Sequence, residues 1–253
     1  MYPIPPNATR VRYLQSDGSA NIKMLLPVGL SAGYAAMAVD MEFVTAPTST
    51  AGCGYYQTTN RLFAGRITSG TAYEKLAFRV RGKDCYSTTT SDAGRHRYYA
   101  DTQTGAVTFD GSSIAASGTS GTITVTAVGV FGRTNNNGTA WEAYGTPMRV
   151  YSFKFWKNGV LIYDLVPIRV GTTGAMFNRA TGETIYNQST GSFVLGPDTF
   201  QQGVVPTRMT VNGTLVRSYV PVRVGSVGYL FDRVSGQLFG NAGTGAFTLG
   251  PDK

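Results

Sequence analysis

Leu165-Val-Pro-Ile-Arg-Val-Gly171 and Gly174-Ala-Met-Phe-Asn-Arg-Ala-Thr-Gly182 return almost unchanged further along the chain. The second copy lies 54 positions later and includes Val220-Pro221, Arg223-Val224-Gly225, Phe231, Arg233 and Gly236. Residues 157–198 align with residues 211–252 without a gap, which indicates a true internal duplication. Because a solenoid needs three or more repeats to bury a continuous core, we expect one parent domain with a second copy of its last unit appended.

Each copy has the pattern of β-structure. Asn158-Gly159 stands between two apolar runs and predicts a hairpin, because both central residues of a type I′ turn need a positive φ. Before that turn, Tyr151, Phe153 and Phe155 alternate with Ser152, Lys154 and Trp156, which is the period of a strand. A second hairpin follows, in which Gly182 suits a left-handed turn position. The unit is therefore predicted to be a pair of β-hairpins.

The composition favours an all-β protein. The 253 residues include 32 Gly and 11 Pro, only 14% of them are charged, and no segment has a sustained helical period. We predict a two-sheet antiparallel jelly-roll sandwich over residues 10–198, in which Met37, Val39, Met41 and Phe43 face the core. Residues 1–9 are predicted to form an extended arm suited to docking on a neighbour, and residues 199–253 to hold the second hairpin unit.

The net charge and the cysteine content limit the ligands and the cellular compartment that fit this chain. The net charge is +8, but the basic residues are scattered and no nucleic-acid-binding motif accompanies them. The pairs Arg10/Arg12, Arg79/Arg81 and Arg95/Arg97 would each point to one side of a strand. Neither a signal peptide nor an 18-residue apolar run is found, so we expect folding in a cytoplasm with Cys53 and Cys85 as reduced thiols.

Catalytic and metal sites have little support in the sequence. Asp40 and Glu42 are the only carboxylates with glycosidase-like spacing, but position 38 is Ala, and outward-facing acids on a strand explain the pair equally. His96, the only histidine, has Arg on both sides and would be a poor general base. We predict no catalytic residues, no metal and no cofactor.

Aromatic and amide side chains on loops are the best candidates for ligand binding. Rings that stack on sugar faces and amides that bond hydroxyl groups suit a glycan. Residues 45–60 are predicted to form a loop with Tyr55 and Tyr56 near its tip. The full candidate set is Tyr55, Tyr56, Asn135, Asn136, Asn137, Trp141 and Tyr144. The alternative is that the Asn-rich segment makes a turn and that Trp141 packs beneath it.

The chain also resembles a known family of β-sandwiches. Tyr13-Leu-Gln-Ser-Asp-Gly-Ser-Ala-Asn-Ile22, Val128-Gly-Val-Phe-Gly-Arg-Thr-Asn-Asn-Asn-Gly138 and Arg149-Val-Tyr-Ser-Phe-Lys-Phe-Trp-Lys-Asn-Gly159 carry the resemblance. The order of these segments resembles a concanavalin A-like (laminin-G-like) jelly roll of the kind found in bacteriophage and prophage structural proteins. The resemblance covers about residues 10–198, and the second unit departs from it.

The first function that this resemblance implies is a non-enzymatic virion protein of a fibre, tail or capsid surface. Its partners would be itself and other virion proteins, and it would assemble in the bacterial cytoplasm without binding nucleic acid or entering a membrane. The alternatives are a carbohydrate-binding adhesin on a virion or on a bacterial cell surface, which would recognise host glycans, and a glycan hydrolase. The fold alone does not choose among them, because this sandwich serves many functions.

Overall fold

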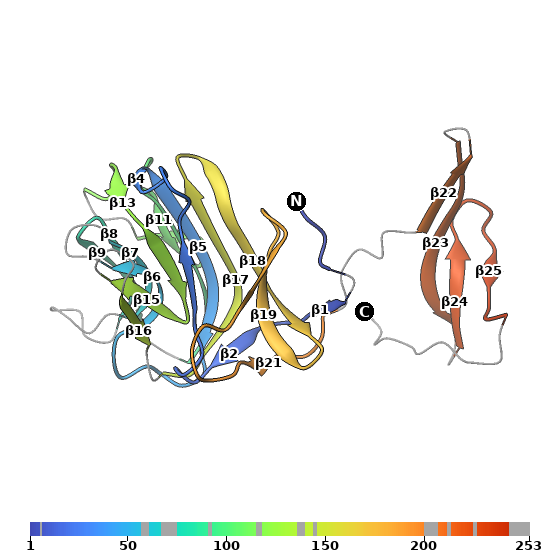
Figure 1. Cartoon of the computed structure of the whole chain (residues 1–253), viewed down its shortest axis with the longest axis horizontal. Helices are drawn as coiled ribbons and strands as arrows, with labels where there is room; N and C mark the ends of the chain where they lie inside the picture. The colour runs from blue at the N-terminus through green and yellow to red at the C-terminus, as the bar shows by residue number, and fades with distance from the viewer. Residues whose placement is uncertain are drawn as a thin grey trace. The chain divides into compact units, whose positions relative to one another are not determined.

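The structure is a computed structural model that describes residues 1–5, 7–56, 61–66, 75–90, 93–114, 118–135, 140–143, 146–199, 207–211, 214–224 and 227–242. Every regular element among these residues is a β-strand, which confirms the all-β prediction (Figure 1). The chain divides into two compact units, Met1–Thr199 and Phe200–Lys253. The boundary lies one residue after Asp198, which ends the first copy of the repeat.

The first unit contains a large sheet of 11 strands. Its main path is β12 (Ser112–Ser113), β11 (Val107–Phe109), β10 (Arg95–Asp101), β5 (Ala35–Phe43), β17 (Met148–Lys157), β18 (Val160–Val170), β19 (Thr173–Asn178) and β20 (Glu183–Tyr186). Three short strands join it from the side: β1 (Ala8–Arg10) pairs with β18, and β2 (Leu14–Ser16) pairs with β17 and β21 (Val194–Leu195). All of these pairings are antiparallel.

The second sheet of this unit has eight strands. They are β16 (Ala140–Ala143), β15 (Gly132–Asn135), β6 (Ala51–Tyr56), β7 (Arg61–Arg66), β8 (Lys75–Val80), β9 (Lys83–Thr90), β14 (Ala127–Val130) and β3 (Ile22–Leu25). The pair β15–β6 is parallel, and the others are antiparallel. A separate pair consists of β13 (Ile123–Thr124) and β4 (Ala32–Gly33).

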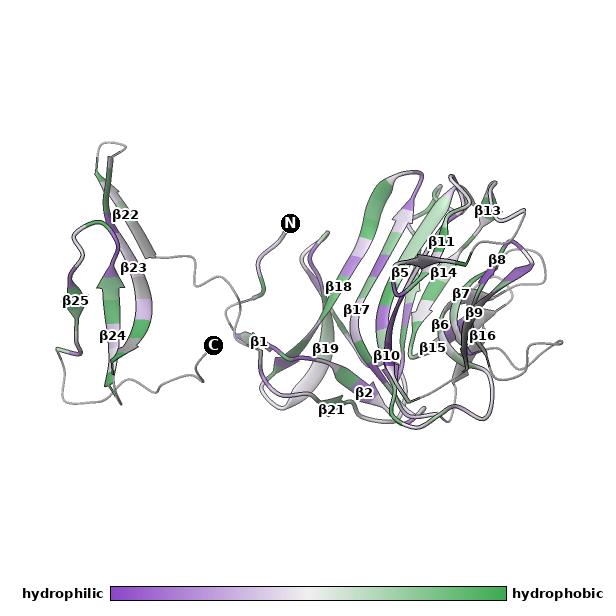
Figure 2. Ribbon diagram, turned by 180° about the vertical axis from the view of Figure 1, so that it is seen from behind, coloured by the Kyte–Doolittle hydropathy of each residue, from purple (hydrophilic) through white to green (hydrophobic). Residues whose placement is uncertain are grey.

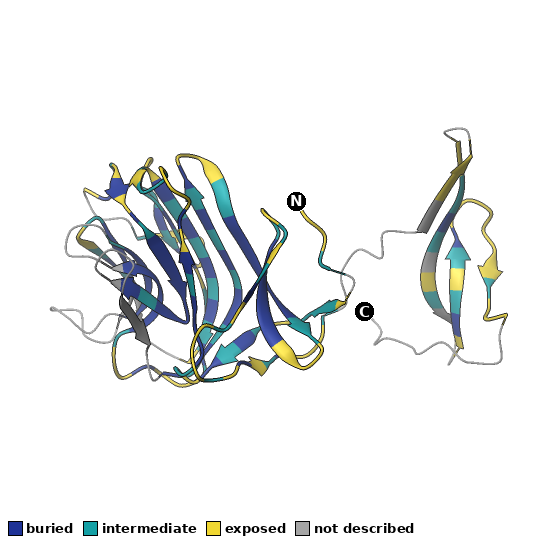
Figure 3. Ribbon diagram, viewed as in Figure 1, coloured by how far each residue is buried: buried dark blue, intermediate teal, exposed yellow. Residues whose placement is uncertain are grey.

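The two large sheets form a sandwich around one core. Along β5 the side chains alternate between buried and half-buried from end to end, as the sequence predicts. The inward side chains of both sheets belong to one hydrophobic cluster, and Cys53 Sγ of β6 lies 4.0 Å from Met41 Sδ of β5. Most of the buried side chains of the two sheets are apolar (Figures 2 and 3).

Tight turns occur where the sequence predicts them. Asn158 and Gly159 both have positive φ, at 48° and 78°, and join β17 to β18 as a type I′ turn would. Asp110 and Gly111 also have positive φ, at 49° and 82°, and join β11 to β12, because Asp-Gly favours the same turn type. Arg81, with φ 48°, lies in an unpredicted turn between β8 and β9, so it does not share a strand face with the buried Arg79. That Arg-pair prediction is therefore wrong.

The N-terminal segment packs on its own chain. Tyr2 N donates a hydrogen bond of 2.7 Å to Arg179 O, and β1 pairs with the end of β18. Ile4 and Ala8 pack on a second apolar cluster formed by Val166, Ile168, Ala175 and Phe177. The apolar side chains of Ile4 and Ala8 thus cover part of the outer face of the first repeat, and docking of the segment on a neighbouring subunit stays a prediction.

The second unit is a four-stranded sheet whose strands pair in the same register as those of the first copy of the repeat. Its strands are β22 (Thr207–Val211), β23 (Thr214–Val224), β24 (Val227–Asp232) and β25 (Leu238–Phe239). The partners Leu165↔Asn178 of the first copy correspond to Tyr219↔Asp232 of the second. The irregularity after Phe155 in β17 also recurs after Met209 in β22. The duplication is therefore present in the strand pairing as well as in the amino-acid sequence.

Candidate functional site

The candidate ligand contacts that the structure describes lie on neighbouring strands of the second sheet: Tyr56 and Asn135 are register partners, and Trp141 is the partner of Thr134. Tyr55 lies in β6 and its side chain is fully buried in the core, so the predicted loop is wrong there and Tyr55 has no surface to offer a ligand. The backbones of Tyr56, Asn135 and Trp141 belong to β6, β15 and β16, but their side chains lie outside the described set. Asn136, Asn137 and Tyr144 also lie outside the described residues.

A different site is formed by the outer face of the large sheet, where β5 runs between β10 and β17. The strand alternation directs Ala36, Ala38 and Asp40 of β5 away from the core. Hydrogen-bond register places larger residues of the neighbouring strands beside them. The rows are Asp101–Ala36–Trp156, Tyr99–Ala38–Lys154 and Arg97–Asp40–Ser152. Because alanine side chains end at Cβ, β5 forms the floor of a trough between two higher walls.

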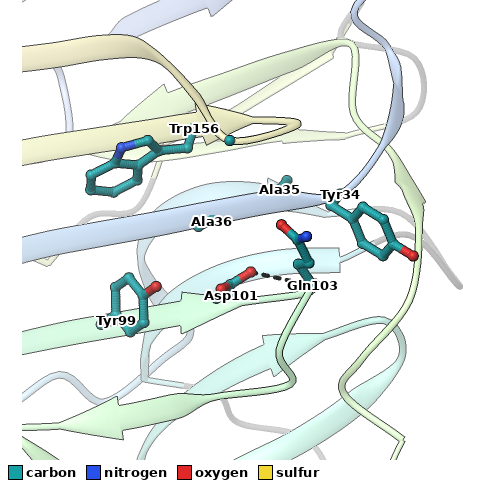
Figure 4. A pocket seen from close by; sticks show the side chains of 8 residues that line it. Tyr34, Ala35, Ala36, Tyr99, Asp101, Gln103 and Trp156 are labelled. Carbon is teal, nitrogen blue, oxygen red and sulfur yellow. Dashed lines mark hydrogen bonds between the residues drawn. The ribbon is translucent and has the colours of Figure 1, made fainter.

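Two adjoining hollows make up this trough. One, of about 150 Å³, is lined by Tyr34, Ala35, Ala36, Tyr99, Asp101, Gln103, Trp156 and Gly159 (Figure 4). The other, of about 360 Å³, continues along β5 past Ala38 and Asp40 toward Gly111. Tyr99 and Trp156 line both hollows, and in Figure 4 they stand on either side of β5. No sequence pattern indicates this site, because the outward-facing Ala36 and Ala38 carry no functional group.

Ion pairs hold the two carboxylates of β5. Arg95 Nε and Nη2 donate to the two oxygens of Asp40 at 2.7 and 2.8 Å, and Arg97 Nε lies 3.5 Å from Asp40 Oδ2. Arg149 Nη1 donates to Glu42 Oε1 at 2.8 Å, and the Tyr151 hydroxyl donates to Glu42 Oε2. The hydrogen bond to Asp40 raises the pKa of Arg95.

This network favours a structural role for Asp40 and Glu42. The Arg95 guanidinium lies 3.7 Å from the centre of the Tyr151 ring, which joins the two ion pairs into one layer. Burial, followed by the neighbouring Glu42, raises the pKa of Tyr151 to about 12. A glycosidase needs one carboxylic acid to hold a proton and the other to face a substrate. Both carboxylates here accept bonds from guanidinium groups instead.

Other titratable groups form local contacts. His96 Nδ1 lies 2.7 Å from Asp110 Oδ2, and its ring packs 4.7 Å from that of Phe109. Asp17 accepts hydrogen bonds from the amide and hydroxyl of Ser19 at 2.8 and 2.5 Å. Within the described ranges, no group of three His, Cys, Asp or Glu residues is placed to hold a metal ion.

The second copy of the repeat is the other candidate surface. Phe155 and Met176 are fully buried in the sandwich core, whereas their counterparts Met209 and Leu230 are 56% and 38% exposed. Eight of the sixteen exposed large hydrophobic side chains of the described residues belong to this unit. Several segments of its strands are intermediate or exposed (Figure 3). The unit thus keeps the pairing of the first copy while its apolar side chains remain in contact with solvent.

Comparisons with known proteins do not assign this chain to a family. No family model matches the sequence, and no curated protein matches it. The described part of the chain also has no helix of sufficient length and apolarity to span a membrane.

Proposed function

We propose that the protein is a non-enzymatic structural component of a bacteriophage particle. It is a jelly-roll module of a fibre, tail or capsid surface that is assembled in the bacterial cytoplasm. Its C-terminal repeat joins it to further copies of itself and to other virion proteins. The observation that carries this proposal is the contrast between Met176 and Leu230, which occupy the same place in two sheets of identical register but differ in burial.

The physical argument begins with size. In the first copy, the second sheet of the sandwich covers one face and the N-terminal segment covers the other. The described part of the second unit is a single four-stranded sheet, whereas a domain core needs two packed layers to bury an apolar face. Exposed apolar area of this kind usually marks a protein contact. A further subunit that covers this sheet would supply the burial that the first copy obtains within its own domain.

Two further observations support a structural role. The large sandwich matches the all-β class that the resemblance to phage structural domains implies. Asp40 and Glu42, the only pair with glycosidase spacing, are held by Arg95 and Arg149, which disfavours the hydrolase alternative. The carbohydrate-binding alternative keeps a separate basis in the trough along β5.

Two experiments test this proposal. Mass spectrometry of density-gradient-purified particles of the encoding phage should detect the chain at a stoichiometry typical of a structural protein. Replacing Leu230 by Lys should weaken self-association at least about tenfold, because it places a charge in the contact. Val160→Lys is the matched control, since Val160 is 60% exposed in the first unit and should leave association unchanged.

The two results have separate meanings. A chain that is absent from purified particles would refute the virion role. A Leu230→Lys variant that associates as strongly as the wild type would refute the role of the C-terminal sheet, even if the chain is found in the particle.

A further inference from the structure

We infer that the trough along β5 is a binding site for an unbranched glycan, with Tyr99 and Trp156 as its stacking walls. This site is separate from the C-terminal repeat and goes beyond the assembly role proposed above. It also differs from the loop residues that the sequence suggested, since none of those residues lines the trough.

The form of the trough suits a chain better than a single sugar. Its floor runs along β5 from Ala36 to Asp40, a distance of about 13 Å at the usual rise per strand residue. The hollow at the Asp40 end has a volume of about 360 Å³, within the roughly 300–1,000 Å³ of typical ligand sites. Because both hollows share Tyr99 and Trp156, a ligand in one continues into the other.

The walls have the chemistry that pyranose rings require. A sugar ring has apolar faces that pack on aromatic rings and a rim of hydroxyl groups that need hydrogen-bond partners. Tyr99 and Trp156 supply the rings on opposite sides of β5, and Tyr34, 38% exposed, adds a third at one end. Asp101 and Gln103 offer a carboxylate and an amide beside them (Figure 4).

Charge along the trough is balanced. Lys154 and Arg97 line the larger hollow together with Asp40, while Asp101 lies in the smaller one. Arg97 Nε is 3.5 Å from Asp40, and Lys154 Nζ is 3.8 Å from Asp164 of the next strand. Two cationic and two anionic side chains thus line the site, which favours a neutral glycan over a strongly anionic one.

Other ligand classes fit less well. An extended peptide binds a sheet by adding a strand at an open edge, but β5 is paired on both sides, so its backbone offers no such edge. Phosphate groups are commonly held at a helix N-terminus, and every regular element in the described part of the chain is a strand.

The test uses the full chain and defined probes. A printed array of bacterial polysaccharides, together with soluble cellohexaose, chitohexaose and maltohexaose, should yield at least one unbranched ligand. Calorimetric titration of that ligand should then show about tenfold weaker binding for Trp156→Ala and for Tyr99→Ala. Tyr99→Phe, which keeps the ring, should bind within about threefold of the wild type.

Two further variants separate the trough from the rest of the surface. Ala38→Leu leaves every proposed contact in place but fills the floor, and it should abolish binding. Tyr186→Ala removes an aromatic ring that is 45% exposed on β20 of the same sheet and should leave binding unchanged.

Two outcomes would overturn the inference: no array glycan or hexaose binds, or a glycan binds equally well to Trp156→Ala and Ala38→Leu. Binding of a free monosaccharide as tightly as its hexaose would also contradict it, because the trough would then hold one sugar rather than a chain. Circular dichroism of each variant checks that the sandwich remains folded.

Discussion

Asn178 and Asp232 accept the same backbone hydrogen bonds in the two copies of the repeat. Asn178 Oδ1 accepts from Asp164 N at 2.9 Å and from Ala180 N at 3.0 Å. Asp232 Oδ1 accepts from the equivalent amides of Ser218 and Val234 at 2.9 and 3.1 Å. The residue that donates its amide is Asp164 in the first copy and Ser218 in the second, and the residue that accepts is Asn178 in the first and Asp232 in the second. The carboxylate therefore lies on different strands in the two copies.

The cationic partner has moved with the charge. In the first copy, Arg179 Nη2 donates to Asp164 Oδ1 at 3.0 Å. In the second, Arg217 Nη1 donates to Asp232 Oδ2 at 2.9 Å. Each copy thus keeps one buried carboxylate, one neutral partner and one guanidinium, although the sequence positions differ. This exchange keeps a buried carboxylate paired with a guanidinium in both copies.

Asp232→Asn should loosen the second unit, because Arg217 loses its carboxylate while the two backbone bonds survive. Hydrogen exchange of the β23 and β24 amides, followed by mass spectrometry, should become several-fold faster. Adding Ser218→Asp should recover part of the protection, since it recreates the arrangement of Asp164 and places a carboxylate within reach of Arg233. Unchanged exchange in the single variant would show that the buried charge contributes nothing.

The same carboxylate makes the second unit sensitive to acid. Burial alone would raise the pKa of Asp232. The hydrogen bonds from Ser218, Ser235, Val234 and Arg217 together lower the pKa by more than burial raises it, so the pKa in the folded chain lies below its ordinary value. Its contribution to stability is therefore present above the unfolded pKa of about 3.9 and is lost as the pH falls. Exchange protection of β24 should decrease between about pH 5 and pH 3, and much less so in Asp232→Asn.

Stability of the sandwich should change little between about pH 8.5 and pH 10, because two buried groups act with opposite sign. Lys157 is fully buried and donates to Gly33 O and Ile123 O at 3.1 Å, and burial lowers its pKa to about 8. Unfolded lysine titrates near 10.4, so the contribution of Lys157 to the free energy of unfolding rises with pH between these values. Burial raises the pKa of Cys53 to about 12, and unfolded cysteine titrates near 8.5, so the contribution of Cys53 falls with pH above about 8.5. Burial raises the pKa of Tyr151 and Tyr163 to about 12, which removes stability above about pH 10.

Urea denaturation followed by tryptophan fluorescence from pH 7 to pH 11 tests this profile. The midpoint should stay nearly level from about pH 8.5 to pH 10 and then fall. In Lys157→Met the fall should begin near pH 8.5, because the titration of Cys53 is then no longer offset. A wild-type midpoint that declines steadily from pH 7 would contradict the assignment.

Cys53 and Cys85 should not form a disulfide in the folded chain. Cys53, Ala64, Phe78 and Cys85 are successive register partners across β6, β7, β8 and β9. Three strand spacings place the two cysteine Cα atoms about 14 Å apart, whereas a disulfide needs less than about 7 Å. Burial raises the pKa of Cys53 to about 12. Iodoacetamide at pH 8 should therefore modify Cys53 only after denaturation, and a Cys53–Cys85 peptide in unreduced digests would refute this account.

Features that depend on a local sequence pattern can be predicted from the sequence, whereas features that depend on pairing between distant strands cannot. The strand of Met37 to Phe43, the turn at Asn158 and the register of the repeat are local patterns, so alternation and turn chemistry reveal them. The glycines before Tyr55 favour a loop by sequence, but the structure places Tyr55 in β6. In the structure, those glycines allow β6 and β7 to approach closely: a Cβ on Gly54 would collide with Leu62 O.

The trough and the N-terminal docking depend on long-range pairing. Ala36 and Ala38 become a floor only because β10 and β17 flank β5, and those strands are far apart in sequence. Ile4 packs on the cluster around Val166 because β1 pairs with β18, and no local pattern near residue 4 indicates that pairing. A single sequence does not show which distant strands are neighbours, so features built from three strands remain hidden in it.

The most direct test of the central claim is sedimentation equilibrium of the full chain against a chain ending at Thr199. That end point retains the hydrogen bond from Thr199 N to Arg10 O, so the first unit keeps all of its described contacts. The full chain should be multimeric at micromolar concentration, and the shortened chain should be a folded monomer whose far-ultraviolet spectrum is still that of a β-protein. A shortened chain that assembles as the full chain does, or a full chain that stays monomeric and outside its particle, would contradict that claim.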